Sequence, residues 1–375
     1  MALQDCYFKQ ARRGFCISVF AISLAGLSYA QEATDPGFAG SEGGGASGGE
    51  IFDPSDRFVP PEALPIVDVY IKEALTLSEA EAREELTAIS VTPDGEMEML
   101  APTDEIVEAM MESIARLENG FAVESEDDDA GMTGGTAPDP AAEGANEDSD
   151  AFEGESVQAE SVIGSDTRVR ITGTTRYPFR TVGRIDIGCT GTLIGPRHVL
   201  TAGHCVYNIR NDRWYSNLSF SPGQRDASTR PYGKIGWKRA ISVRGWTRSH
   251  KRNYDYAMIV LREDVGNRVG WMGYGWKKPM PKYNVNINGY PGDKPRGTMW
   301  HAFCKMRIIT TYRLYYPCDT AGGMSGSGVY LYRASQNKRT IYGIHAYGVD
   351  GTGLNGATRI RKPVFENLKR WKATY

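Results

Sequence analysis

The sequence Gly322-Gly-Met-Ser-Gly-Ser-Gly328 decides how this chain is interpreted, because two further motifs precede it in a fixed order. The first is Thr201-Ala-Gly-His-Cys205, and the second is Asn253-Tyr-Asp-Tyr-Ala257. Together they supply a histidine, an aspartate and a serine, in that order along the chain. One such motif is weak evidence of a catalytic site, whereas three in sequence are specific.

These residue types suit nucleophilic catalysis. A serine hydroxyl is a poor nucleophile at neutral pH, and His204 can act as the base that activates Ser325. Asp255 would hold the imidazole in one tautomer and stabilise its protonated form. The glycines around Ser325 allow a tight turn in which the amides of Gly323 and Ser325 point at a developing oxyanion.

The charge of the chain is divided unevenly. Residues 31–160 carry a net charge of −30 and residues 161–375 a net charge of +25, although the whole chain carries only −3. Segments that differ so strongly are not expected to share one core. We therefore expect an acidic prosegment at 31–160 and a catalytic domain at 161–375.

Residues 1–30 have the pattern of a secretory signal. Basic residues precede the apolar stretch Phe15–Leu27, and Ser28-Tyr-Ala30 offers a small-x-small cleavage site. An uncleaved anchor is the alternative. No second apolar stretch of spanning length follows, so we expect a mature form without a membrane span, exported to the periplasm or out of the cell.

Four cysteines follow the signal, an even number that fits an oxidising destination. Pairing of Cys189 with Cys205 would fasten the loop that carries His204, and pairing of Cys304 with Cys318 would close a hairpin-sized segment. Zinc ligation is the rival interpretation, but no two cysteines have the spacing of a CxxC pair. The sequence predicts two disulfides and no metal site.

The prosegment contains two predicted helices between flexible stretches at 31–50 and 121–160. Ser78-Glu-Ala-Glu81 resembles a capping box and opens a short helix that runs to about Ile89. Thr103 could cap a second helix that stops at Gly120. Its apolar face is predicted to consist of Ile106, Val107, Met110, Ile114 and Leu117.

After Val162 the composition changes to short β-rich runs separated by Gly, Pro and Asn turns. We expect an all-β domain of two antiparallel six-stranded barrels, with the active site in the cleft between them. An amphipathic helix is predicted from Pro363 to Lys372 at the C-terminal end. The clearest strands are expected at Ile185–Ile187, Thr190–Ile194, Tyr256–Leu261, Val285–Asn288, Val329–Leu331 and Ile341–Ile344.

The order His, Asp, Ser is that of chymotrypsin-type serine proteases. From Ser161 to the C-terminus the sequence resembles the bacterial glutamyl endopeptidases among them. The resemblance implies a secreted serine endopeptidase made as a zymogen, which cleaves proteins or peptides after Glu, less readily after Asp, without a metal or organic cofactor. It rests on Ser161-Val-Ile-Gly-Ser-Asp166, Cys189-Thr-Gly-Thr-Leu-Ile194, the His204 and Asp255 motifs, Gly289-Tyr-Pro-Gly-Asp-Lys294, Asp319-Thr-Ala-Gly-Gly-Met-Ser-Gly-Ser327 and Gly343-Ile-His345.

The resemblance also implies an acid-binding pocket. His345 and Thr320 match the positions that bind the substrate carboxylate, with help from a mature N-terminus at Ser161 or Val162. Asp319 stands beside Thr320, so a trypsin-like preference for basic residues stays open as the alternative.

The position directly before the nucleophile bears on activation. Trypsin-like zymogens activate when a new N-terminal ammonium pairs with an Asp at that position, and Met324 cannot accept this ion pair. The bond Glu160–Ser161 follows a glutamate, so the mature enzyme could release itself by cutting there. The opposite charges predict that the prosegment associates with the domain, where it would either cover the cleft or assist folding.

A strongly basic domain also fits a binding module for anionic surfaces with weak or no activity, which is the second hypothesis. The basic residues are scattered, and no nucleic-acid-binding motif is present, so no nucleic-acid partner is expected. We expect a monomer whose partners are peptide substrates and its own prosegment.

Overall fold

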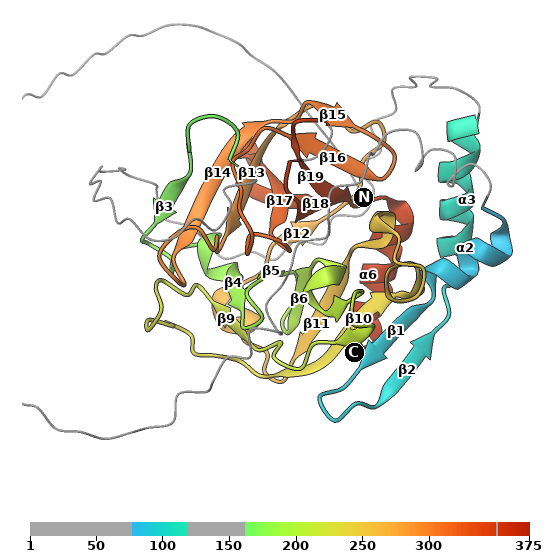
Figure 1. Cartoon of the computed structure of the whole chain (residues 1–375), viewed down its shortest axis with the longest axis horizontal. Helices are drawn as coiled ribbons and strands as arrows, with labels where there is room; N and C mark the ends of the chain where they lie inside the picture. The colour runs from blue at the N-terminus through green and yellow to red at the C-terminus, as the bar shows by residue number, and fades with distance from the viewer. Residues whose placement is uncertain (1–76, 119–161, 350–351) are drawn as a thin grey trace, which may run out of the picture. The chain divides into compact units, whose positions relative to one another are not determined.

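The computed structural model describes residues 77–118, 162–349 and 352–375 (Figure 1). The predicted signal peptide, the predicted flexible stretches at 31–50 and 121–160, and Ser161 lie outside the described residues. Within the described ranges, no helix is both long and apolar enough to cross a bilayer.

Six strands of the catalytic domain form the first barrel. Their order along the sheet is β10-β11-β6-β5-β4-β9. An antiparallel bridge between Phe220 and Ile235, just before β10, brings the two edges of this sheet together. The strands are β4 (Val182–Ile185), β5 (Thr190–Leu193), β6 (His198–Thr201), β9 (Phe220–Pro222), β10 (Trp237–Val243) and β11 (Ala257–Leu261).

The second barrel is built around six longer strands in the order β16-β19-β18-β17-β13-β14. Three short strands extend it: β15 (Ile308–Ile309), β3 (Val169–Ile171) and β12 (Gly273–Tyr274), the last of which pairs in parallel with β18. The predicted two-barrel, all-β fold is therefore confirmed. The six longer strands are β13 (Asn284–Gly289), β14 (Met299–Lys305), β16 (Arg313–Tyr316), β17 (Gly328–Arg333), β18 (Lys338–Tyr347) and β19 (Asn355–Arg359).

One strand prediction was wrong. We expected a strand at Ile185–Ile187, but β4 ends at Ile185, and the chain then turns through Gly188 at φ +104°. Ile187 is nevertheless buried. Its apolar character reflects packing of the turn into the core, which a sequence pattern does not distinguish from strand pairing.

The predicted C-terminal helix is confirmed as α6 (Lys362–Thr374). Its apolar face is buried against the domain, with the Trp371 ring stacked on Tyr256 at a centroid distance of 5.6 Å. The Phe365 ring packs against Tyr274 in a tilted arrangement, with the ring centroids 5.2 Å apart. The helix therefore covers the first barrel and the connection between the barrels.

The N-terminal segment contains two helices, α2 (Glu79–Leu86) and α3 (Asp104–Glu118), as predicted. Ser78 and Glu81 form the expected capping box. The helix that was expected to reach Ile89 ends at Leu86, because the chain turns into an antiparallel hairpin of β1 (Ala88–Val91) and β2 (Met97–Leu100). Strand β1 pairs with β10 and so extends the sheet of the first barrel (Figure 1).

The expectation that the two charge-segregated parts have separate cores was also wrong. Apolar residues of α2 and α3, including Leu86, Ile106 and Met110, belong to one buried cluster with the first-barrel residues Ile241 and Ile259. Net charge is a property of surface residues, so it does not report on how the apolar faces of two segments pack.

Candidate active site

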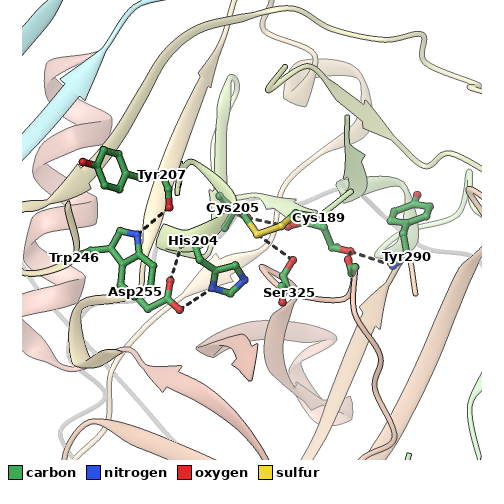
Figure 2. The surroundings of a disulfide bond; sticks show 11 residues. Cys189, His204, Cys205, Tyr207, Trp246, Asp255, Tyr290 and Ser325 are labelled. Atoms are coloured by element: carbon green, nitrogen blue, oxygen red, sulfur yellow. Dashed lines mark hydrogen bonds and ion pairs between the residues drawn. A yellow bond between two sulfur atoms is a disulfide. The ribbon is translucent and has the colours of Figure 1, made fainter. Parts of the chain in front are cut away.

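Two short 3-10 turns bring His204 and Asp255 together. His204 lies in the 3-10 turn η3 (Gly203–Cys205) after β6, and Asp255 directly follows the turn η4 (Arg252–Tyr254). The Nδ1 atom of His204 is 2.8 Å from Oδ2 of Asp255, and the backbone N–H of His204 donates to Oδ1 at 2.9 Å. These two contacts fix the imidazole relative to the carboxylate (Figure 2).

Asp255 is completely buried, and its charge is balanced locally. Burial opposes ionisation, but the adjacent His204 and hydrogen bonds to the carboxylate outweigh it and lower the pKa of Asp255. The carboxylate therefore stays ionised at neutral pH, where it can orient His204 and stabilise an imidazolium.

Ser325 lies on the glycine-rich loop that connects β16 with β17 of the second barrel, and in Figure 2 the His204 ring lies between Asp255 and Ser325. The loop geometry requires its glycines. Gly323 has φ +98°, and a Cβ atom there would lie 2.5 Å from the carbonyl oxygen of Tyr290. The backbone N–H of Thr190 donates to the carbonyl oxygen of Ser325 at 2.9 Å, which fixes this loop to the first barrel.

The residue before the nucleophile is part of the core. Met324 is fully buried in the apolar cluster of the second barrel. A Cβ atom on Gly289 would lie 3.2 Å from Cβ of Met324, so these two motifs pack against each other. The loop is therefore supported by apolar packing at the position where trypsin-like zymogens use an ion pair.

Both predicted disulfides are present, between Cys189 and Cys205 and between Cys304 and Cys318. The first connects the start of β5 with the turn that carries His204, and both of its cysteines are fully buried. It lies beside the catalytic residues in Figure 2.

His345, predicted to bind the substrate carboxylate, lies on β18 and is 2% exposed. Its Nδ1 atom is 2.8 Å from the hydroxyl of Tyr316. Burial, with a smaller contribution from nearby His204, lowers the pKa of His345 to about 3. His345 is therefore neutral at physiological pH, and it can meet an anionic ligand only by donating an N–H group.

Thr320 and Asp319 have different environments although they are neighbours. The Thr320 hydroxyl is fully buried and makes no hydrogen bond with any residue that the structure describes. Asp319 accepts from the backbone N–H of Ile163 at 2.8 Å, and from the N–H and hydroxyl of Thr167 at 2.8 and 2.6 Å. Both carboxylate oxygens of Asp319 are thus engaged by the segment that follows the predicted maturation site.

A cluster of ion pairs, which the sequence analysis did not identify, holds the same segment. The buried guanidinium of Arg168 pairs with Asp166 and with Asp293, and Lys294 approaches Asp166 at 2.8 Å. Arg168 and Lys294 keep the pKa of Asp166 well below its usual range. Two motifs that identify the family resemblance therefore contact each other, which the spacing along the sequence could not show.

Tyr347 was also missed by the sequence analysis. Its ring lies 6.1 Å from the ring of His204, and the guanidinium groups of Arg252 and Arg313 lie over it, 4.9 and 4.2 Å from its centroid. Tyr347, Arg252 and Arg313 come from β18, η4 and β16, and no local motif connects them.

A buried aspartate–histidine pair beside a serine on a glycine-rich loop, between two antiparallel barrels, defines the serine peptidase class of chymotrypsin type. Comparison with known proteins agrees. The family model for trypsin matches residues 166–307. A glutamyl endopeptidase of Bacillus licheniformis is 43% identical over 220 residues, which cover 56% of this chain and 69% of that protein.

Two further relatives extend the comparison. A Bacillus subtilis protein named extracellular metalloprotease is 39% identical over 228 residues, covering 58% of this chain and 71% of that protein. A solved structure of a Glu endopeptidase in complex with MPD is 31% identical and superposes with a TM-score of 0.53, covering 56% of this chain and 99% of the other. The chain belongs to the trypsin family of serine proteases, in its glutamyl endopeptidase branch, and is a serine endopeptidase.

The name of the Bacillus subtilis relative raises the question of a metal ion. In the parts of the chain with described side chains, one group of three close donors could be considered, formed by Cys189, His204 and Cys205. Both cysteines belong to the same disulfide, whereas the thiolate is the form that binds a metal. These donors do not fit a metal ion, and we derive no catalytic step through one.

Proposed function

We propose that this serine endopeptidase cleaves peptide bonds after glutamate, and less readily after aspartate. The observation that carries this proposal is the engagement of Asp319. Its two oxygens accept three hydrogen bonds from Ile163 and Thr167, so its charge is already compensated by the chain itself. A basic substrate side chain would have to displace these donors, which disfavours the trypsin-like alternative.

Two neighbouring groups support an acidic preference. The buried Thr320 hydroxyl has no hydrogen-bond acceptor among the described residues, so it is available to donate to a substrate carboxylate. Neutral His345 can donate an N–H group to a substrate carboxylate. A mature N-terminus at Ser161 or Val162 would add a positive charge close to Asp319, because Ile163 is already bound there.

In the proposed mechanism each of these residues has one role. Ser325 attacks the peptide carbonyl carbon while His204 takes the proton of its hydroxyl and later gives a proton to the leaving amine. Asp255 holds the imidazole through Nδ1. The amides of Gly323 and Ser325 stabilise the oxyanion, and water then releases the acyl group by the same route.

The protein would be made as an exported zymogen, with residues 1–30 as its signal and 31–160 as its prosegment. Cleavage of Glu160–Ser161 would free an N-terminus two residues before the Ile163 contact with Asp319. Among the described residues, 77–118 pack with β10, α4 (Arg244–Thr247) and α6, which favours assistance in folding over occlusion of the cleft. N-terminal sequencing of the secreted protein tests the maturation site, and a start more than two residues from Ser161 would contradict it.

The specificity is tested with peptides that are identical except for Glu, Asp, Lys or Phe at the cleavage position. We expect kcat/KM for the Glu peptide to exceed that for the Lys peptide by about a hundredfold or more, because the wrong charge leaves buried polar groups unpaired. Ser325→Ala should lower kcat by about a millionfold. Preferred cleavage after Lys would overturn the acidic pocket while leaving the mechanism intact.

A further inference from the structure

Residues 77–118 are built into the first barrel as one of its layers. Strand β1 lies antiparallel to β10 along its whole length, from the pair Ala88–Val243 to the pair Val91–Ala240. This pairing covers the edge of a seven-residue strand that would otherwise present free backbone groups. The hairpin partner β2 then forms the outer edge of the sheet.

The apolar face of this segment is as deeply buried as the barrel itself. Its side chains join the same core cluster as the barrel and pack against α6. Hydrogen bonds also connect the segment to α6. The Asn367 amide donates to the carbonyl oxygen of Leu86 at 3.5 Å, and Arg370 donates to the carbonyl oxygen of Ala101. The buried members are Ala82, Leu86, Ala88, Val91, Ile106, Val107, Met110 and Ile114.

Charge complementarity supports the same packing of residues 77–118 against the catalytic domain. Residues 77–118 carry 12 acidic and 2 basic side chains. Three of the acidic side chains form ion pairs with basic residues of the domain. The ion pairs are Glu84 with Arg244, Glu85 with Lys251 at 2.9 Å, and Glu98 with Arg239 at 3.0 Å.

Residues 77–118 also contact the 244–254 loop, which leads to Asp255. The backbone N–H of Arg244 donates to the carbonyl oxygen of Thr87 at 2.9 Å. A Cβ atom on Gly245 would lie 2.7 Å from the Glu85 carboxylate and 2.4 Å from the Tyr254 ring. The N-terminal segment therefore contacts this loop at Arg244, Gly245 and Lys251, and Gly245 in turn packs against Tyr254, which directly precedes Asp255.

From these contacts we propose that residues 77–118 stay bound to the catalytic domain after the chain is cut between 119 and 161. The mature enzyme would then be a non-covalent complex of two chains. The bound segment supports the 244–254 loop and thereby positions Asp255. This inference deepens the proposed zymogen function and rests on it, because only a cleaved chain has a separate prosegment.

A cut that does not depend on the enzyme's own specificity tests the inference. The full chain carries Ser325→Ala and the recognition sequence of an unrelated protease within 121–160. After cutting, the protein is passed through size exclusion at about micromolar concentration, and each peak is analysed by denaturing mass spectrometry. Both fragments in one peak would support the inference, and elution of the N-terminal fragment by itself would overturn it.

A charge reversal with a matched control identifies the contact. Glu85→Lys places like charges beside Lys251 and should raise the dissociation constant of the cut complex by about tenfold or more. Glu108→Lys makes the same change of charge at an exposed position of α3 and should leave it unchanged. Equal effects of the two variants would show that net charge, and not the contact of Glu85 with the 244–254 loop, holds residues 77–118 on the domain.

The supporting role of the segment is read in the active enzyme. With Ser325 present, Glu85→Lys should lower kcat several-fold with little change in KM, because the substrate pocket is not touched. Glu108→Lys should match the wild type. An unchanged kcat in Glu85→Lys, with the fragment released, would overturn the positioning role. Because the cut with Ser325→Ala needs no activity, a failure of the Glu preference and a failure of retention are separately visible.

Discussion

Asp319→Asn tests how the acid pocket is built. The wild-type carboxylate is 2% exposed and accepts three hydrogen bonds, one on Oδ1 from Ile163 and two on Oδ2 from Thr167. Asparagine keeps one acceptor oxygen and turns the other position into a donor that faces existing donors. A charged hydrogen bond contributes about 1.5–3 kcal/mol, so we expect a loss of about 2–4 kcal/mol of stability.

The loss should appear in two assays. In the Ser325→Ala background the midpoint of thermal unfolding should fall by about 4–16 °C. In the active enzyme kcat/KM for a Glu peptide should fall by about tenfold or more, since the segment after the mature N-terminus loses its anchor. Asp264→Asn is the matched control, because its ion pair with Arg197 is partly exposed and contributes little.

Two outcomes would refute this reasoning. Unchanged stability together with unchanged Glu hydrolysis would mean that Asp319 does not anchor residues 163–167. Cleavage after Lys by the wild type, lost in Asp319→Asn, would mean that Asp319 reads the substrate directly. The first result would remove the structural argument made from Asp319, and the second would return the trypsin-like alternative.

Three further predictions concern other parts of the domain. Arg168→Ala should destabilise the protein by about 3–5 kcal/mol in denaturant unfolding, because Asp166 and Asp293 would lose the cation that they share. A change below about 1 kcal/mol would contradict this. Burial, reinforced by nearby basic groups, lowers the pKa of His198 to about 4, so the unfolded chain binds its proton first and stability falls as pH drops from about 6.5 to about 4. His198→Phe should recover up to about 3 kcal/mol at pH 4 relative to pH 7, and an unchanged pH profile would exclude His198 as the cause. Gly323→Ala should lower kcat by about a hundredfold or more, since its Cβ atom would meet the Tyr290 carbonyl oxygen, and near-normal turnover would argue against Gly323 in the oxyanion site.

Much of the site was accessible from the sequence because its chemistry is written in short motifs. His204 and Ser325 each lie in a short motif that determines the turn around them, and Asp255 lies in a third short motif. Both disulfides could be predicted from an even count of cysteines and short loops. The helix α6 could be predicted because a single amphipathic face fixes its period.

The tertiary structure decided which distant segments complete these local units. The hairpin at Ala88–Leu100 was not predicted, because β1 pairs on one side with β2 and on the other with β10, a partner about 150 residues away in sequence. The four residues of β1 are small or apolar, so their sequence alone is as compatible with the end of a helix as with a strand. The charge division between the two parts suggested separation, whereas their apolar faces form one core.

The sequence by itself determined the residue types of the candidate active site, their order and the all-β class, since these depend on local motifs and on the period of apolar residues. Only the tertiary structure decided that Asp319 is occupied by residues 163–167, that Tyr347 lies beside His204, and that residues 77–118 complete the first barrel. Each of these contacts joins residues more than 140 positions apart. Such pairings depend on how the barrels fold in three dimensions, which spacing along the chain does not encode.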